Sequence, residues 1–96
     1  MALTADNMID QALANREKTA EGFDWKAPEG PATIKGTAFI DAAGDCKGDG
    51  TKIKERAKAF SETFGIPENL AVHRIALASR RTGIKTPFVN KILTSL

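Results

Sequence analysis

The chain has 96 residues, of which 42% are hydrophobic and 27% are charged, and its net charge is +2. These values fit one small globular domain near the lower size limit for an adequate core, so we expect a protein partner or a homo-oligomer. No apolar run approaches the roughly 18 residues of a membrane span, and the N-terminus has neither a basic leader nor an apolar signal core. We therefore expect no membrane contact and a cytoplasmic location, free or within a virion or other assembly in the host cytoplasm.

Basic and acidic side chains are unevenly distributed along the chain. Residues 1–50 carry five basic and nine acidic side chains, a net charge of −4, whereas residues 51–96 carry nine basic and three acidic ones, a net charge of +6. This difference predicts a basic face on the C-terminal half that meets a polyanion or an acidic protein. A solvated helical surface whose lysines only aid solubility explains the same distribution.

The first predicted element is an amphipathic helix within residues 1–22. Apolar side chains recur at spacings of three and four along one stripe, which includes Met8, Ile9, Ala12, Leu13 and Ala20. Thr4 or Asp6 is placed to cap the start of this helix, and Gly22 is placed to end it.

Residues 23–50 are predicted to form an irregular arm. Six of the eight glycines and two of the four prolines lie between residues 22 and 50, which disfavours a regular helix there. Only TIKGTAFID, residues 33–41, has the composition of a strand, and Gly36 interrupts it. A short hairpin or an edge strand is the most that this segment supports.

Phe23 and Trp25 are the candidate partner-binding residues of this arm. They lie in FDWKAPEGPATIKG, a segment that no helix of its own can cover. Such a segment either drapes over the helical core or docks on another chain, where tryptophan commonly anchors an interface. The second alternative makes the protein a non-enzymatic structural or accessory subunit of a larger assembly, such as a phage particle or a multiprotein complex.

Residues 45–56, DCKGDGTKIKER, look at first like a calcium loop. Such loops need oxygen ligands at alternate positions and a carboxylate at the twelfth. Here Lys47 stands at the third position and Arg56 at the twelfth, and these cations repel a metal ion. The run also lacks the Gly-Lys-Ser or Gly-Lys-Thr ending of a phosphate-binding loop. We predict no metal site, and we interpret GDGT, residues 48–51, as a turn followed by a helix cap.

Residues 51–96 are predicted to form a trihelical core that folds independently. An apolar stripe defines a first helix of about 13 residues: Ile53, Ala57, Phe60 and Phe64. Gly65 ends it, and a largely apolar, central helix begins at Pro67. Thr86 caps the last helix, with Pro87 at its first position. The predicted fold class is therefore mainly α: a small helical domain with an N-terminal helix, an irregular middle with at most a short strand or hairpin, and this core.

The connection between the last two helices, SRRTGIKTPFVNKIL at residues 79–93, has a defined spacing. A small residue lies four positions before a glycine, and aliphatic residues lie one, six and nine positions after it: Ser79, Gly83, Ile84, Val89 and Ile92. The small residue lets the helices approach, the glycine accepts a left-handed turn, and the aliphatics hold the second helix against the first. Residues 75–93 resemble the helix-turn-helix of bacterial and phage repressors.

This resemblance implies that the chain binds duplex DNA through side chains around the last helix. The candidate nucleic-acid-binding residues are Arg80, Arg81, Lys85, Thr86, Asn90 and Lys91. The basic side chains are expected near phosphates, and Thr86 and Asn90 near base edges. A plain corner between two packed helices is the alternative interpretation of the same pattern.

No group of residues predicts catalysis. His73 is the only histidine and lies on a largely apolar helix, as core or boundary histidines do. Cys46 is the only cysteine, which excludes an internal disulfide and a cysteine-cluster zinc site and favours a free, inert thiol. We expect a protein that is not an enzyme and that has no cofactor and no small-molecule substrate.

Overall fold

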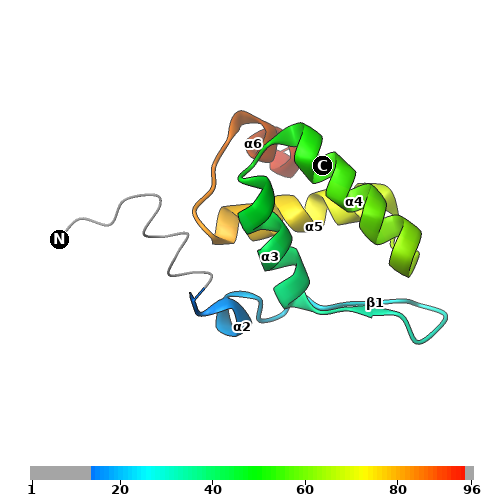
Figure 1. Ribbon diagram of the computed structural model, residues 1–96. Helices are drawn as coiled ribbons and strands as arrows, with labels where there is room; N and C mark the ends of the chain where they lie inside the picture. Colours follow the sequence, from blue (N-terminus) through cyan, green and yellow to red (C-terminus); the bar gives the residue numbers. More distant parts are fainter. Residues whose placement is uncertain (1–13, 95–96) are drawn as a thin grey trace.

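In the computed structural model, which describes residues 14–94, five helices and one short hairpin follow one another along the chain (Figure 1). The elements are α2 (Arg16–Thr19), β1 (Trp25–Lys26), β2 (Thr33–Ile34), α3 (Gly36–Cys46), α4 (Gly50–Phe64), α5 (Glu68–Arg81) and α6 (Pro87–Thr94). This mainly helical architecture with a two-stranded hairpin confirms the predicted fold class. Within residues 14–94, no helix has both the length and the apolar character that crossing a lipid bilayer requires.

The N-terminal segment is described only from residue 14 onward. The predicted stripe and caps at residues 1–13 lie outside the described residues, and α2 itself has four residues. Arg16 Nε donates a hydrogen bond to Asp41 of α3 at 3.0 Å, and the two side chains form an ion pair. Gly22 lies in the turn that follows, with a φ of +80°. The ion pair therefore joins α2 to the side of α3.

The hairpin accounts for only a small part of the predicted strand. β1 pairs antiparallel with β2, so that Trp25 lies opposite Ile34 and Lys26 opposite Thr33. Of the strand predicted at residues 33–41, only Thr33 and Ile34 are in a strand. The prediction that residues 23–50 are irregular is wrong for α3, an 11-residue helix.

α3 forms because the glycine at its start permits a close contact between two parts of the backbone. A Cβ atom at position 36 would lie 2.6 Å from the carbonyl oxygen of Ala20 and 2.8 Å from Cβ of Phe23. The Gly36 N–H donates to the Asp24 carboxylate at 2.6 Å, which satisfies one free donor of the first turn. Gly36 is thus needed for packing. The strand ends at Ile34, before Gly36, as the sequence indicated, and Gly36 begins α3.

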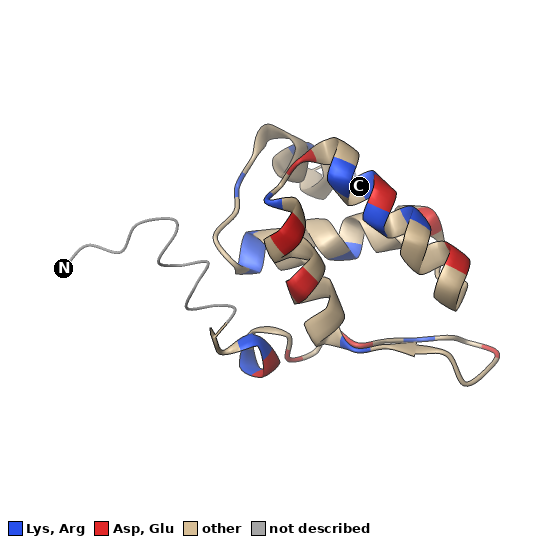
Figure 2. Cartoon of the chain, in the orientation of Figure 1, with Lys and Arg blue, Asp and Glu red and all other residues tan. Residues whose placement is uncertain are grey.

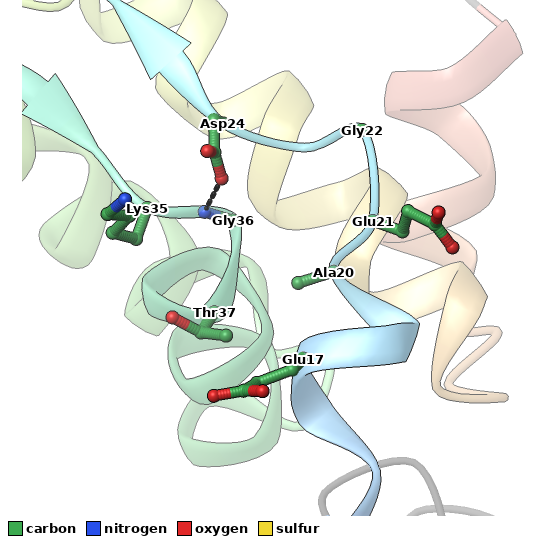
Figure 3. Close-up of a pocket in the computed structure, with 8 residues that line it drawn as sticks. All are labelled: Glu17, Ala20, Glu21, Gly22, Asp24, Lys35, Gly36 and Thr37. Carbon is green, nitrogen blue, oxygen red and sulfur yellow. Dashed lines mark hydrogen bonds between the residues drawn. The ribbon is translucent and has the colours of Figure 1, made fainter.

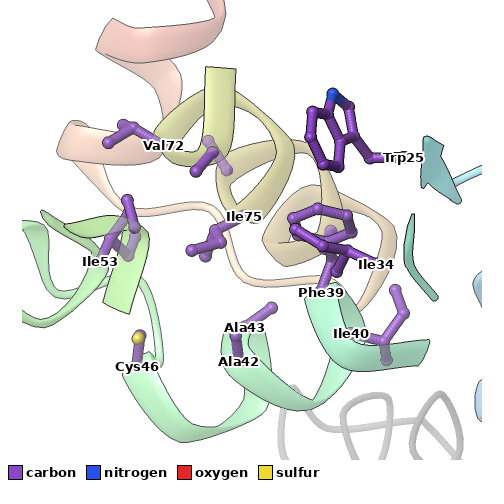
Figure 4. Close-up of a cluster of buried hydrophobic side chains, with 14 of the residues drawn as sticks. Trp25, Ile34, Phe39, Ile40, Ala42, Ala43, Cys46, Ile53, Val72 and Ile75 are labelled. Carbon is purple, nitrogen blue, oxygen red and sulfur yellow. The ribbon is translucent and has the colours of Figure 1, made fainter. Parts of the chain in front are cut away.

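α5 is the central helix, and it packs against α3, α4 and α6. Ile75 of α5 lies between Ile53 of α4 and Phe39 of α3 in the core, and all three side chains are fully buried (Figure 4). This confirms the prediction of a buried central helix. The core is not confined to the predicted range 51–96, because the side chains of α3 and of the hairpin fill one side of it.

The helix boundaries from residue 49 onward follow local signals in the sequence. The Asp49 carboxylate caps α4 by accepting hydrogen bonds from the N–H groups of Thr51 at 2.9 Å and Lys52 at 3.1 Å. Gly65 ends α4 in the left-handed conformation, with a φ of +81°. Pro67, which the sequence predicts at the first helical position of α5, is its N-cap, and the helix begins one position later at Glu68.

Candidate nucleic-acid interface

The connection from α5 to α6, residues 79–86, is called the corner below. Gly83 adopts a left-handed conformation with a φ of +84°, and the Ile84 N–H donates to the Ser79 carbonyl at 2.8 Å. The Ser79 side chain is fully buried and its hydroxyl donates to the Ile75 carbonyl at 2.9 Å. Ile84 and Val89 are buried. The small residue, the glycine and these two aliphatics therefore occupy the places that the sequence pattern predicted.

α6 has one face toward the protein and one toward solvent. Its inner face is apolar: Phe88 is half-buried, Val89 is fully buried, and Ile92 and Leu93 are half-buried. Exposed residues at spacings of three and four form the other face, here called the outer face: Pro87, Asn90, Lys91 and Thr94. The outer face therefore offers amide, ammonium and hydroxyl groups to a ligand.

The turn between α3 and α4, residues 47–49, fits against the start of α6. The Thr86 hydroxyl donates to the Gly48 carbonyl at 2.8 Å. A Cβ atom at position 48 would lie 2.9 Å from a methyl group of Ile84, and one at position 50 would lie 2.8 Å from the Phe88 ring. Glycine at both positions thus permits the contact. The sequence indicated a turn and a cap at residues 48–51 but did not indicate the element on which this turn packs.

Thr86 caps α6 and also joins it to the α3–α4 turn. Its hydroxyl accepts a hydrogen bond from the Val89 N–H at 3.3 Å, which caps α6, and it also donates to Gly48. The predicted capping role is confirmed. The predicted contact with base edges stays a prediction, and the half-buried hydroxyl already donates one hydrogen bond and accepts another.

Arg81 is exposed, but its guanidinium is bound by the N-terminal segment. Its guanidinium donates to the carbonyl oxygens of Thr19 and Glu21, both at 2.9 Å, and lies 4.5 Å from the centre of the Phe23 ring. A phosphate contact by Arg81, which stays a prediction, would compete with these two hydrogen bonds. No sequence signal could have found these partners, because they lie about 60 residues earlier in the chain.

The remaining four candidates are exposed: Arg80, Lys85, Asn90 and Lys91. They lie at the C-terminal end of α5, in the corner and on the outer face of α6. No acidic side chain occurs between residues 69 and 94, and Figure 2 shows no red segment on α6 or on its connection to α5. The basic side chains of this stretch therefore have no acidic neighbour within the stretch itself, which favours a positive potential around them.

Phe23 and Trp25 are covered by the chain itself. Their exposed fractions are 4% and 7%, and Trp25 lies beside Ile34 and Phe39 in the core (Figure 4). Of the two alternatives for this segment, the structure shows that it drapes over the core. The prediction that these side chains anchor a partner is wrong for this conformation, because neither ring is accessible to one.

A cavity of about 680 Å³ lies between α2 and the start of α3 (Figure 3). Its lining includes the carboxylates of Glu17, Glu21 and Asp24 and the ammonium group of Lys35. The Gly36 N–H already donates to the Asp24 carboxylate at 2.6 Å, so this N–H group is not available to an anion. The lining contains neither histidine nor cysteine, and residues 14–94 hold no group of side chains suited to a metal ion.

The two residues with potential acid-base or redox chemistry are separate from this cavity. Cys46 is buried at the end of α3, and this burial raises the pKa of its thiol. A raised pKa keeps the thiol protonated and reduces its reactivity. His73 is half-buried on α5.

Comparisons of the chain with protein-family models, with curated proteins and with solved structures found no significant match. The function is therefore inferred from the shape and the charge of the surface around α6. That surface combines an ordered corner, an exposed polar face on a short helix and several basic side chains.

Proposed function

We propose that the chain binds duplex DNA through the corner, with the outer face of α6 in the major groove. The observation that carries this proposal is an exposed, polar face on a short helix that follows a left-handed glycine turn, in a stretch without acidic side chains. The major groove of B-DNA is about 12 Å wide and accepts an α-helix. The basic surroundings favour the approach of a phosphate backbone.

The four exposed candidates have different roles in this proposal. Arg80, Lys85 and Lys91 contact phosphates, which positions the protein without reading sequence. Asn90, on the outer face of α6, is suited to bidentate hydrogen bonding with an adenine edge. Arg81 and Thr86 are bound by other parts of the chain, and the proposal assigns them no DNA contact.

Binding of the wild-type chain to duplex and single-stranded DNA at two salt concentrations tests the proposal. We expect duplex binding that weakens steeply as salt increases, because phosphate contacts release counterions. Arg80→Ala should lower the slope of log affinity against log salt by about one unit. Lys26→Ala is the control, because Lys26 is exposed on the hairpin, away from the corner.

Asn90→Ala separates sequence reading from backbone attraction. It should relax the preference at one base pair and cost roughly 1–3 kcal/mol on the preferred site. The salt slope should stay at the wild-type value, because Asn90 carries no charge. Equal losses of affinity on all sequences would contradict the assigned role of Asn90.

The alternative is a non-enzymatic structural or accessory subunit of a larger assembly, such as a phage particle. Absence of duplex binding by the wild-type chain at low salt would contradict the DNA proposal and favour this alternative. A size measurement of the free protein in the same experiment reports whether it forms a homo-oligomer. Neither proposal assigns the chain a catalytic step, a cofactor or a metal ion.

A further inference from the structure

We infer that the α3–α4 turn and the first turns of α4 form a second phosphate-binding element, in which Lys47 and Lys54 contact the DNA backbone beside α6. This inference rests on the proposed duplex binding and extends it to residues outside the helix-turn-helix pattern. Its basis is the contact that joins this turn to α6, together with the placement of the charges around that contact.

The turn is held in a fixed position relative to α6. Gly48 accepts the hydrogen bond from Thr86 at 2.8 Å, and Gly50 lies directly against the Phe88 ring. Thr86 and Phe88 are on the first turn of α6 or just before it, so the turn lies at the end of α6 where a recognition helix enters the groove. Any duplex that contacts the outer face of α6 there also comes close to this turn.

The lysines of this element are exposed. Lys47 ends α3 in a left-handed conformation, with a φ of +49°. Lys54 lies on the side of α4 that faces α6, with Nζ 5.8 Å from the centre of the Phe88 ring. Lys91 follows Phe88 by three positions on α6, so Lys54 and Lys91 belong to two neighbouring helices.

The neighbouring carboxylates are already engaged. Asp49 accepts hydrogen bonds from two backbone N–H groups of α4. Asp45 forms an ion pair with Arg56, with the two charged atoms 3.0 Å apart. These partners are groups other than Lys47 and Lys54, so a phosphate does not have to break these contacts to reach the two lysines.

The shape of DNA explains why a second element is needed. The major groove is bordered by phosphates on both sides, and a helix about 10–12 Å across fills its width. Arg80 and Lys85 belong to the corner, whereas Lys54 belongs to α4, so the basic side chains come from two separate segments that both adjoin α6. The two elements can thus contact the two phosphate strands that border one groove.

Lys52 provides a matched control. It is exposed on the same two turns of α4 as Lys54, but it lies with Asp45, Glu55 and Arg56 around a hollow on the α3 side. Lys47→Ala and Lys54→Ala should each lower the salt slope of duplex binding by about one unit and weaken binding roughly three- to tenfold at low salt. Lys52→Ala should change neither quantity, and Lys54→Arg should retain both.

The outcomes separate this inference from the proposed function. Loss of slope in the Lys47 and Lys54 variants, with an unchanged Lys52 variant, supports the second element. Wild-type binding with unchanged slopes in Lys47→Ala and Lys54→Ala overturns this inference only, and leaves the corner as the DNA-binding site. Absence of wild-type duplex binding overturns both. Circular dichroism of each variant checks that the fold is intact, which is expected because all three lysines are exposed.

Discussion

Helices α3 and α4 follow each other along the chain, but they contribute to the core in different ways. Six of the 11 residues of α3 are buried, including Phe39 and Ile40, whereas only Ile53 and Ala57 are buried among the 15 residues of α4. α3 is short and rich in alanine and glycine, and it lies between the hairpin and α5. α4 has a conventional apolar stripe and leaves most of its surface in solvent.

This difference shows what an amphipathic pattern can reveal. A helix with one buried stripe and one charged face has a clear periodicity, and the sequence predicted α4 for that reason. A helix buried on several sides has little contrast between its faces, and small residues allow it to approach its neighbours closely. The composition of α3 therefore resembled that of a loop, although α3 supplies more of the core.

Removal of α3 should have the largest effect. The sequence alone predicted that residues 51–96 fold independently, but the buried side chains of α3 reverse this expectation. A fragment of residues 51–96 should lack a cooperative thermal transition, because isolated helices of about 12–15 residues are marginal in water. The full chain, residues 1–96, should show a cooperative transition, and circular dichroism compares the two. A cooperative transition in the shorter fragment would show that α3 is dispensable.

A pair of phenylalanines in contact, one on each helix, allows a direct comparison of α3 and α4. The Phe39 ring of α3 and the Phe60 ring of α4 are in edge-to-face contact, with centroids 5.4 Å apart, but Phe39 is fully buried and Phe60 only half-buried. Phe39→Ala should cost roughly 3–5 kcal/mol of unfolding free energy, because it leaves a cavity in the core. Phe60→Ala should cost about 1–3 kcal/mol, because less apolar area is lost. Urea denaturation measures both values, and equal losses would contradict the comparison.

The glycines after the two helices differ in their surroundings. Gly48 has a φ of +77° and Gly65 a φ of +81°, so an alanine at either position is strained by roughly 1–2 kcal/mol. At position 48 the added methyl group also meets Thr86 and Ile84, whereas at position 65 it meets no atom within 4 Å. Gly48→Ala should therefore cost roughly 1–3 kcal/mol more than Gly65→Ala. Similar thermal stabilities of the two variants would show that the turn yields without disturbing α6.

The caps of the two helices should give the smallest effects. Asp49 caps α4 from the adjacent position, whereas Asp24 caps α3 from 12 residues away. Asp24→Ala and Asp49→Ala should each cost about 0.5–2 kcal/mol in the intact chain. In an isolated peptide of residues 47–64, Asp49→Ala should still reduce helicity, because this cap is local. An Asp49 effect confined to the intact chain would show that this cap also depends on tertiary structure.

On the candidate DNA surface, too, some features have local causes and others depend on residues far away in the chain. The sequence pattern found the corner through Ser79, Gly83 and Ile84, since each residue acts on the backbone within a few positions of itself. Arg80 and Arg81 are both exposed, but the sequence pattern did not indicate that Arg81 alone is bound by carbonyls of the N-terminal segment. Adjacent arginines look equivalent in a sequence, and only the position of α2 distinguishes them.

The sequence by itself determined the elements whose causes are local. The stripe of α4, the Asp49 cap, the left-handed Gly65 and the cap of α6 at Thr86 depend on interactions within about one helical turn, so their signals are contiguous. Tertiary structure decided the features whose partners are distant. The start of α3 lies in close contact with Ala20, and the Trp25 side chain is buried against the core. The position of the α3–α4 turn depends on its contact with the first turn of α6. These contacts depend on the relative positions of packed elements, which no local spacing encodes.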